Sequence, residues 1–310
     1  MYLALENIRK AYDTKVAVEN LSLSVPKGVL YGIIGPNGAG KTTTIRMIMN
    51  IIAPDSGRVM FDGKPADETF VNRVGYLPEE RGLYKKMTLR EVILYMAELK
   101  GCKPAAAKDR ILPWLKRMGL ETYVDKKVEE LSKGMAQKLQ FVTTILHEPE
   151  IIILDELFSG LDPLNVELMK NVLLEQKRAG KTILFSTHVM EQAEKLCDYI
   201  CMISRGKKVL DGKIGDIKAK FGKNAIQVEV EGDGSFIRSL PGVSSVTDFN
   251  NYHELRLANN SNPHSILKQI IERVPVRRFE LVEPSLYDIF IDIAKVDPSE
   301  IDKPQVAANE

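Results

Sequence analysis

A glycine-rich stretch, GPNGAGKTT at residues 35–43, constrains this chain more than any other feature. It matches the pattern G-x-x-x-x-G-K-[ST]. An apolar, β-branched run (VLYGIIG) ends in it, and a segment with apolar residues at helical spacing (KTTTIRMIMNII) leaves it. A strand, a glycine-rich turn and a helix in that order begin a parallel α/β sheet. Spacing, residue types and context therefore predict a binding site for a nucleoside triphosphate, and an accidental glycine-rich turn is the weaker alternative.

Each part of this loop has a chemical role. Its glycines leave room for backbone N–H groups to converge on phosphate oxygens, and the helix N-terminus adds partial positive charge. Lys41 can reach the β- and γ-phosphates, and Thr42 can place its hydroxyl on Mg²⁺. We expect the whole loop to bind nucleotide: Gly35, Pro36, Asn37, Gly38, Ala39, Gly40, Lys41, Thr42 and Thr43.

A second motif, IIILDELFSGLD at residues 151–162, places two acids directly after an apolar run. In a fold with a phosphate loop, the strand ending in an acid lies beside the strand that leads into the loop. Asp155 is therefore expected to point toward the same phosphates and to hold Mg²⁺. One acid suffices for the metal, so Glu156 is free to act as a general base on the water that attacks the γ-phosphate. An ordinary exposed strand end is the alternative for Glu156.

Charge and composition narrow the class of partner. Lys plus Arg is 43 and Asp plus Glu is 42. This near-neutral balance gives no general electrostatic reason to expect nucleic acid or anionic lipid as the binding partner.

No apolar run approaches the ~18 residues of a spanning helix, and no signal peptide is expected. The few cysteines suit a reducing compartment, and we interpret Cys197 and Cys201 as core residues rather than metal ligands.

The remaining pattern predicts two domains. Strand-like runs at 151–154 and 182–186, with a helix between them, continue the sheet, whereas residues 89–120 are helical in composition, with a kink or boundary at Pro113. Alternating apolar residues and one helical stretch near the C-terminus indicate a small α+β unit. We predict a large α/β domain at 1–211 with a helical subdomain at about 86–145, a linker at 212–220, an α+β domain at 221–296 and a disordered tail at 297–310.

Three further motifs resemble those of the ATP-binding subunits of ABC transporters, and the resemblance covers roughly residues 1–211. LSKGMAQKLQ (131–140) looks like the ABC signature, SGLD (159–162) resembles the loop after the acid pair, and STH (186–188) resembles the switch histidine. Ser132 precedes a helical pattern, which predicts an N-cap with free N–H groups and hence a second anion site. The resemblance implies a P-loop NTPase fold, an ABC-type ATPase cassette, with ATP and Mg²⁺ as its cofactors.

The resemblance also implies roles for single residues. Two copies pack head to tail, so that each ATP lies between one P-loop and the partner's signature residues, here Ser132, Lys133 and Gly134. Asp162 resembles the residue at the dimer seam, His188 the γ-phosphate sensor, and Tyr12 the aromatic residue that stacks on adenine.

The chain departs from the family pattern at three positions. Glu79 stands where relatives usually have Gln; we expect it to bind Mg²⁺, to take part in catalysis and to make nucleotide binding more dependent on Mg²⁺. Lys133 replaces a glycine and either adds a cation near the partner's γ-phosphate or points to solvent. Met135 lacks the polar contact that Gln would offer in trans to the ribose.

The C-terminal segment FELVEPSLYDIFID (279–292) resembles the closing motif of an accessory domain in bacterial exporter-type subunits, including sodium- and drug-export relatives. Leu286, Ile289 and Phe290 form a helical apolar face that suits core or dimer packing.

We therefore expect an ATP-hydrolysing subunit that forms a homodimer or heterodimer on binding ATP. It would drive a separate transmembrane permease from the cytoplasmic face of the membrane, as a peripheral protein and by analogy an exporter. The alternative is a non-transport ABC ATPase that acts on DNA or ribosomes, but such relatives join two cassettes or insert coiled coils, and this chain has one cassette without sustained heptads. A P-loop kinase would need a binding site for the phosphate acceptor, and that function would not explain the LSKGMAQK motif.

Overall fold

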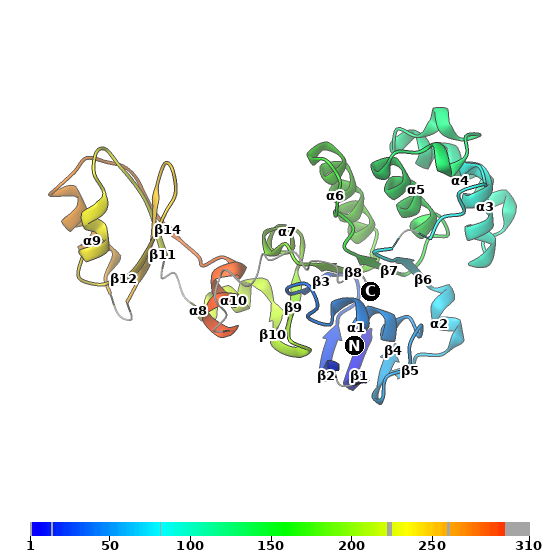
Figure 1. Cartoon of the computed structure of the whole chain (residues 1–310), viewed down its shortest axis with the longest axis horizontal. Helices are drawn as coiled ribbons and strands as arrows, with labels where there is room; N and C mark the ends of the chain where they lie inside the picture. The colour runs from blue at the N-terminus through cyan, green and yellow to red at the C-terminus, as the bar shows by residue number, and fades with distance from the viewer. Residues whose placement is uncertain (1, 14, 81, 222–224, 259–260, 295–310) are drawn as a thin grey trace. The chain divides into compact units, whose positions relative to one another are not determined.

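The strand that leads into the glycine-rich loop is β3 (Leu30–Ile34), and all five of its residues are buried. It lies inside a six-stranded sheet with the order β10-β9-β3-β8-β7-β6 (Figure 1). The strands β6 to β9 run parallel to β3, whereas β10 is antiparallel to β9. The expectation that the strand ending in Asp155 lies directly beside β3 is wrong, because β8 pairs with both strands and separates them. Their bounds are β6 (Val74–Leu77), β7 (Ile151–Asp155), β8 (Thr182–Thr187), β9 (Tyr199–Ser204) and β10 (Lys207–Lys213). Continuous apolar strands of this kind occur in parallel sheets that are covered on both faces.

The structure, a computed structural model, describes residues 2–13, 15–80, 82–221, 225–258 and 261–294. They fall into two compact units that divide between Lys213 and Ile214. The tail expected to be disordered, residues 297–310, lies outside the described residues. No helix among the described residues combines the length and the apolar character needed to span a bilayer.

One face of the parallel sheet is covered by α1 and by a second, antiparallel sheet with the order β2-β1-β4-β5. Residues Ile45 and Ile48 of α1 share an apolar cluster with Leu5 of β1 and Ile153 of β7. The helix therefore packs between the two sheets. The elements are β1 (Leu3–Tyr12), β2 (Lys15–Val25), α1 (Lys41–Ile48), β4 (Ser56–Phe61), β5 (Lys64–Pro65) and the short α2 (Glu68–Asn72).

The other face is covered by helices, because the alternate residues Ile152 and Leu154 of β7 point the opposite way and pack against Leu139 and Val142 of α5. Helices α3, α4 and α5 lie side by side as the expected helical subdomain (Figure 1). The elements on this side are α3 (Leu89–Leu99), α4 (Pro104–Arg117), η1 (Glu121–Tyr123), η2 (Val128–Glu130), α5 (Lys133–Ile145), α6 (Pro163–Arg178) and α7 (Met190–Leu196).

Of the two outcomes expected for Pro113, a kink or a boundary, the boundary is wrong: Pro113 lies inside α4, where the buried residues Ile111 and Leu115 on either side of it hold the helix by packing. Most of residues 212–220, the expected linker, lies in α8 (Ile214–Phe221), which buries Ile214 and Ile217. Cys197 and Cys201, which we expected in the core, pack in the two apolar clusters of the first unit.

The C-terminal unit has an antiparallel sheet with the order β12-β13-β11-β14. Its core contains Ile226 of β11, Leu255 of β13 and Ile266 of α9, and Leu286, Ile289 and Phe290 are fully buried. The elements are β11 (Ala225–Val230), η3 (Ser235–Ser239), β12 (Val243–Asp248), β13 (His253–Leu257), α9 (Pro263–Ile271), β14 (Val276–Val282) and α10 (Leu286–Ala294).

Candidate nucleotide site

The glycine-rich loop runs from the end of β3 into the first turn of α1, as predicted. Gly35 and Gly40 have φ values of 154° and 107°, a region that favours glycine. A Cβ atom on Gly35 would lie 2.0 Å from the carbonyl oxygen of Ile203 in β9, and one on Gly40 would lie 2.4 Å from the carbonyl oxygen of Ala17 in β2. Both glycines are therefore required by conformation and by the close approach of backbone from either sheet.

Lys41 is the first residue of α1, and only 5% of its surface is exposed. Its Nζ donates to the carbonyl oxygens of Gly35 at 2.9 Å and Pro36 at 3.2 Å. The same Nζ lies 3.4 Å from Oε1 of Glu156. The ammonium group is thus held over the loop, between the loop's own backbone and the second acid of the acid pair.

Asp155 ends β7 and is fully buried. The Ser186 hydroxyl in β8 donates to its Oδ1 at 2.5 Å, but its Oδ2 has no hydrogen-bond partner among the described residues. Burial raises the pKa of Asp155 above its ordinary value, whereas the hydroxyl groups of Ser186 and Thr42 act in the opposite direction. Oδ2 of Asp155 and the nearby Thr42 hydroxyl are oxygen ligands. They therefore fit a hard cation such as Mg²⁺, which prefers oxygen ligands.

Glu156 lies between Lys41 and His188. Its Oε2 is 3.0 Å from Nδ1 of His188, while its Oε1 faces Lys41. Only 9% of Glu156 is exposed, and its backbone adopts a φ of 52°, which is uncommon for a residue with a side chain. Its N–H donates to the hydroxyl of Ser186 at 3.1 Å, so one serine holds both acids of the pair.

A cavity of about 670 Å³ connects these side chains. Most of the residues that we predicted to contact nucleotide line it: Tyr12, Asn37, Gly38, Gly40, Lys41, Thr42, Thr43, Glu79, Glu156 and His188. The other three loop residues do not line the cavity. The carbonyl oxygens of Gly35 and Pro36 accept hydrogen bonds from Lys41, and Ala39 is buried. Lys15, Ala17 and Ser159 also line the cavity and were not predicted as site residues, although Ser159 is the first residue of the SGLD motif. At the Tyr12 end, Nζ of Lys10 lies 5.9 Å from the ring centroid.

Glu79 also lines a second cavity, of about 240 Å³, together with Lys133, Asp155 and Glu156. Burial raises the pKa of Glu79, and the charges of Asp155 and Glu156 raise it further. Lys133 in this chain lies over Gly160, where a Cβ atom would be 3.1 Å from its Nζ.

The signature segment begins α5 as predicted. Ser132 is its N-cap, and the hydroxyl oxygen accepts a hydrogen bond from the N–H of Met135 at 3.3 Å. Gly134 follows in the first turn, where a Cβ atom would be 3.7 Å from the side chain of Leu161. Asp162 is exposed and caps α6, because its carboxylate accepts a hydrogen bond from the N–H of Asn165 at 3.0 Å.

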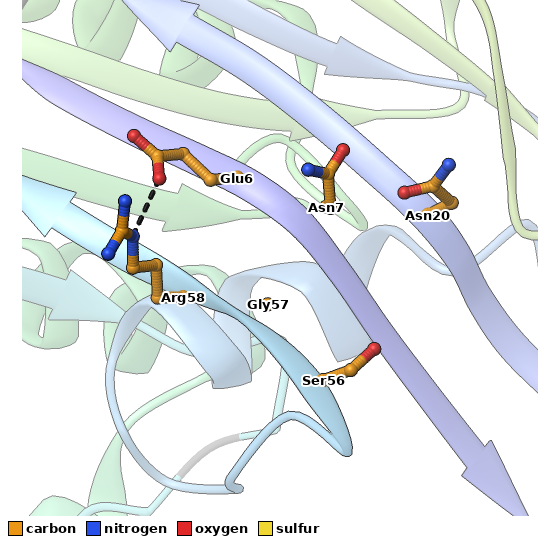
Figure 2. A pocket seen from close by; sticks show the side chains of 6 residues that line it. All are labelled: Glu6, Asn7, Asn20, Ser56, Gly57 and Arg58. Carbon is orange, nitrogen blue, oxygen red and sulfur yellow. Dashed lines mark hydrogen bonds and ion pairs between the residues drawn. The ribbon is translucent and has the colours of Figure 1, made fainter.

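A separate hollow of about 490 Å³ lies on the antiparallel sheet (Figure 2). It is lined by Glu6, Asn7, Asn20, Ser56, Gly57 and Arg58. Glu6 and Arg58 form an ion pair at 2.6 Å, and Gly57 is needed because a Cβ atom there would lie 2.4 Å from two carbonyl oxygens of β1. This hollow is explained by an irregularity in the pairing of β1 and β4 rather than by a set of reactive groups.

Comparison with known proteins agrees with this geometry. A family model described as ABC transporter matches residues 18–159, and a model of the C-terminal domain of DrrA1-3-like ATP-binding proteins matches residues 212–294. The chain is 42% identical over 290 residues, covering 94% of this chain and 97% of the relative, to the uncharacterized ABC transporter ATP-binding protein YhaQ of Bacillus subtilis. It is 40% identical to Nod factor export ATP-binding protein I of Burkholderia orbicola, over 66% of this chain and 69% of the relative.

A solved structure of an ATP-binding subunit of an ABC transporter superposes with a TM-score of 0.67 at 33% identity, covering 72% of this chain and 94% of that one. The fold, the glycine-rich loop, the acid pair and these likenesses all agree. The chain therefore belongs to the ATP-binding subunits of ABC transporters, as an ATPase with a DrrA-like C-terminal domain.

Proposed function

We propose that this subunit binds Mg-ATP in the 670 Å³ cavity and hydrolyses it with Glu156 as the general base. The observation that carries the proposal is the placement of the Glu156 carboxylate, with one oxygen at Lys41 and the other at His188. A general base needs a fixed position within reach of its proton donor, and this carboxylate is held on both sides.

The chain's own groups have distinct tasks in this proposal. Lys41 and the loop N–H groups bind the β- and γ-phosphates, and Tyr12 stacks on the adenine ring. Mg²⁺ would be held by Thr42, Asp155 and Glu79, and when bound it neutralises charge on the β- and γ-phosphates. When Lys41 binds phosphate, its positive charge interacts with the phosphate as well as with Oε1 of Glu156. The carboxylate is then available to accept a proton from water. His188 holds Oε2 and senses the γ-phosphate.

ABC cassettes dimerise and pair with permeases, and we propose the same assembly for this chain. The N-terminus of α5 offers free N–H groups beside Ser132 and Gly134, which would bind the phosphates of the partner's ATP. Lys133 would add a third contact of that site in trans, and Asp162 would lie at the dimer seam. This arrangement supplies each ATP with two anion sites from two different chains.

The assembly would act on the cytoplasmic face of the membrane, where the subunit binds peripherally to a separate permease. Export is the favoured direction. It is supported by the relative named as a Nod factor export protein and by the DrrA-like C-terminal domain.

A tagged Glu156→Gln chain tests this proposal by pull-down from detergent-solubilised membranes, with and without Mg-ATP. The substitution should preserve bound ATP and the closed dimer, and a multi-spanning membrane protein should be recovered. Lys41→Ala is the matched control, because it should bind no ATP and form no ATP-dependent dimer in size-exclusion chromatography. Recovery of ribosomes or DNA-bound proteins from the soluble fraction, with nothing from the membrane, would overturn the transporter assignment.

A further inference from the structure

A stripe of polar side chains runs along α5, the helix that starts at the signature motif. Lys133, Gln137, Gln140 and Thr144 follow one another at intervals of three or four residues and so share one face. The last three are only 5%, 6% and 5% exposed. Burial of polar groups costs free energy unless they are hydrogen-bonded, and a helix face that points inward is normally apolar. Burial alone therefore does not account for polar side chains at these positions.

Two of these side chains, Gln137 and Thr144, contact backbone groups close to the site carboxylates. The side-chain amide of Gln137 donates from Nε2 to the carbonyl oxygen of Leu157, the residue after Glu156. At the other end, the Thr144 hydroxyl donates to the carbonyl oxygen of Gln140 in its own helix at 2.8 Å and lies 3.5 Å from the carbonyl oxygen of Tyr76 in β6. The helix and β6 are so close there that a Cβ atom on Gly75 would lie 2.2 Å from the carbonyl oxygen of Thr144.

The contact at Leu157 acts on a strained residue. Glu156 has a φ of 52°, and a residue with a side chain keeps such a backbone only when its surroundings hold it. Two hydrogen bonds flank it: its own N–H donates to Ser186, and the next carbonyl group accepts from Gln137. The carbonyl oxygen of Glu156 also accepts from the N–H of Ser159 at 3.1 Å, so loss of the Gln137 bond removes one of three hydrogen bonds that fix this backbone.

We propose that Gln137 is a positioning residue, which fixes the backbone at Glu156 so that its carboxylate stays between Lys41 and His188. This inference rests on the proposed role of Glu156 as the base. It has a consequence for communication between sites, because α5 begins at Ser132. The helix whose first turn would contact ATP bound to the partner chain holds, one turn later, the base of its own chain's site.

Gln137→Met tests the proposal, because methionine keeps the length and shape of the side chain and removes only its hydrogen bonds. Measured on the full chain, kcat should fall ~10- to 100-fold, the effect of a misplaced catalytic group, while KM for ATP and the melting temperature change little. Gln140→Met is the matched control. Gln140 is equally buried on the same helix face, and both glutamines line the cavity of about 240 Å³. The amide of Gln140, however, makes no hydrogen bond with the described residues. Its kcat should stay within about twofold of the parent.

A double variant distinguishes positioning through Glu156 from an independent effect. Single-turnover hydrolysis of radiolabelled ATP by Glu156→Gln should be no slower when Gln137→Met is added, because a residue that acts through Glu156 loses its effect once that base is gone. Should Gln137→Met fail to fold, Gln137→Asn retains the amide on a side chain too short to reach the carbonyl, and the same results are expected.

Unchanged kcat in a folded Gln137 variant, or an equal additional loss in the Glu156→Gln background, would overturn the positioning role. If Glu156→Gln itself keeps the parental rate, the proposed base is wrong, and that failure is separate from the result for Gln137. If kcat falls as much in Gln140→Met as in Gln137→Met, the effect comes from helix packing, and this result would also overturn the proposal.

Discussion

The carboxylate of Glu150, the residue directly before β7, offers a prediction about stability that can be worked out from the structure. Its Oε1 accepts a hydrogen bond from Nε of Arg73 at 2.8 Å, and its Oε2 accepts from Nη2 of Arg73 and from the hydroxyl of Tyr2, both at 2.6 Å. These bonds join the residue before β1, the residue before β6 and the residue before β7. They lower the pKa of Glu150 from 4.5 to about 2.

At about 1.4 kcal/mol per pKa unit, this lowering corresponds to roughly 3 kcal/mol in favour of the ionised form. However, 45% of the side chain is exposed, so solvent screening reduces the contribution to about 1 kcal/mol. A depressed carboxylate pKa stabilises the fold above the unfolded-state pKa. The contribution is therefore complete above about pH 5 and is lost as the pH falls from 4.5 toward 2.

Glu150→Gln should therefore lower the melting temperature of the cassette by about 2–4 °C at pH 7. The difference from the parent should shrink as the pH is lowered below 4.5. Scanning calorimetry is the suitable assay, because it can separate the transitions of the two units. Glu148→Gln is the control: its ion pair with Arg110 is 63% exposed at the carboxylate, and its loss should cost less than about 0.5 kcal/mol. An equal loss for Glu150→Gln at pH 7 and pH 3 would refute the electrostatic explanation.

Three further predictions concern the nucleotide site. Glu156→Gln should retain ATP binding by fluorescent-nucleotide titration but lose at least ~100-fold in kcat, and a rate near that of the parent would contradict its role as base. Gly35→Ala should abolish nucleotide binding in calorimetric titration, because its Cβ atom would meet the Ile203 carbonyl oxygen at 2.0 Å; normal affinity in a folded variant would count against the close approach. Glu79→Gln should strengthen ATP binding in EDTA, because the carboxylate adds negative charge beside Asp155 and Glu156, and it should reduce the dependence on Mg²⁺; unchanged binding with and without the metal would refute this.

The parts of the site that the sequence could predict are those built from adjacent residues. The phosphate loop and the acid pair each combine a buried strand with the residues that directly follow it. The capping role of Ser132 likewise depends only on its own turn of helix. Such features need no knowledge of distant contacts, so their chemistry can be inferred from residue type and spacing.

The features that escaped prediction depend on contacts between distant residues. Ser186 was noticed only as part of the STH motif, yet its hydroxyl holds both Asp155 and Glu156 because β8 lies beside β7. Strand β12, VSSVTD, has two apolar residues in six and was missed because its pairing with β13 defines it. The antiparallel sheet was not predicted either, because β1 pairs with β4 across about fifty residues of sequence.

The close approach at the phosphate loop also has a consequence for how relatives of this chain should vary. Gly35 and Gly40 are confined by the carbonyl oxygens of Ile203 and Ala17, and every amino acid carries a carbonyl oxygen. Each glycine should therefore resist replacement, while its neighbour accepts any side chain that suits its own surroundings. Among homologues these two pairs of touching residues should change independently, and a contact map built from correlated substitutions would miss the tightest contacts of the site.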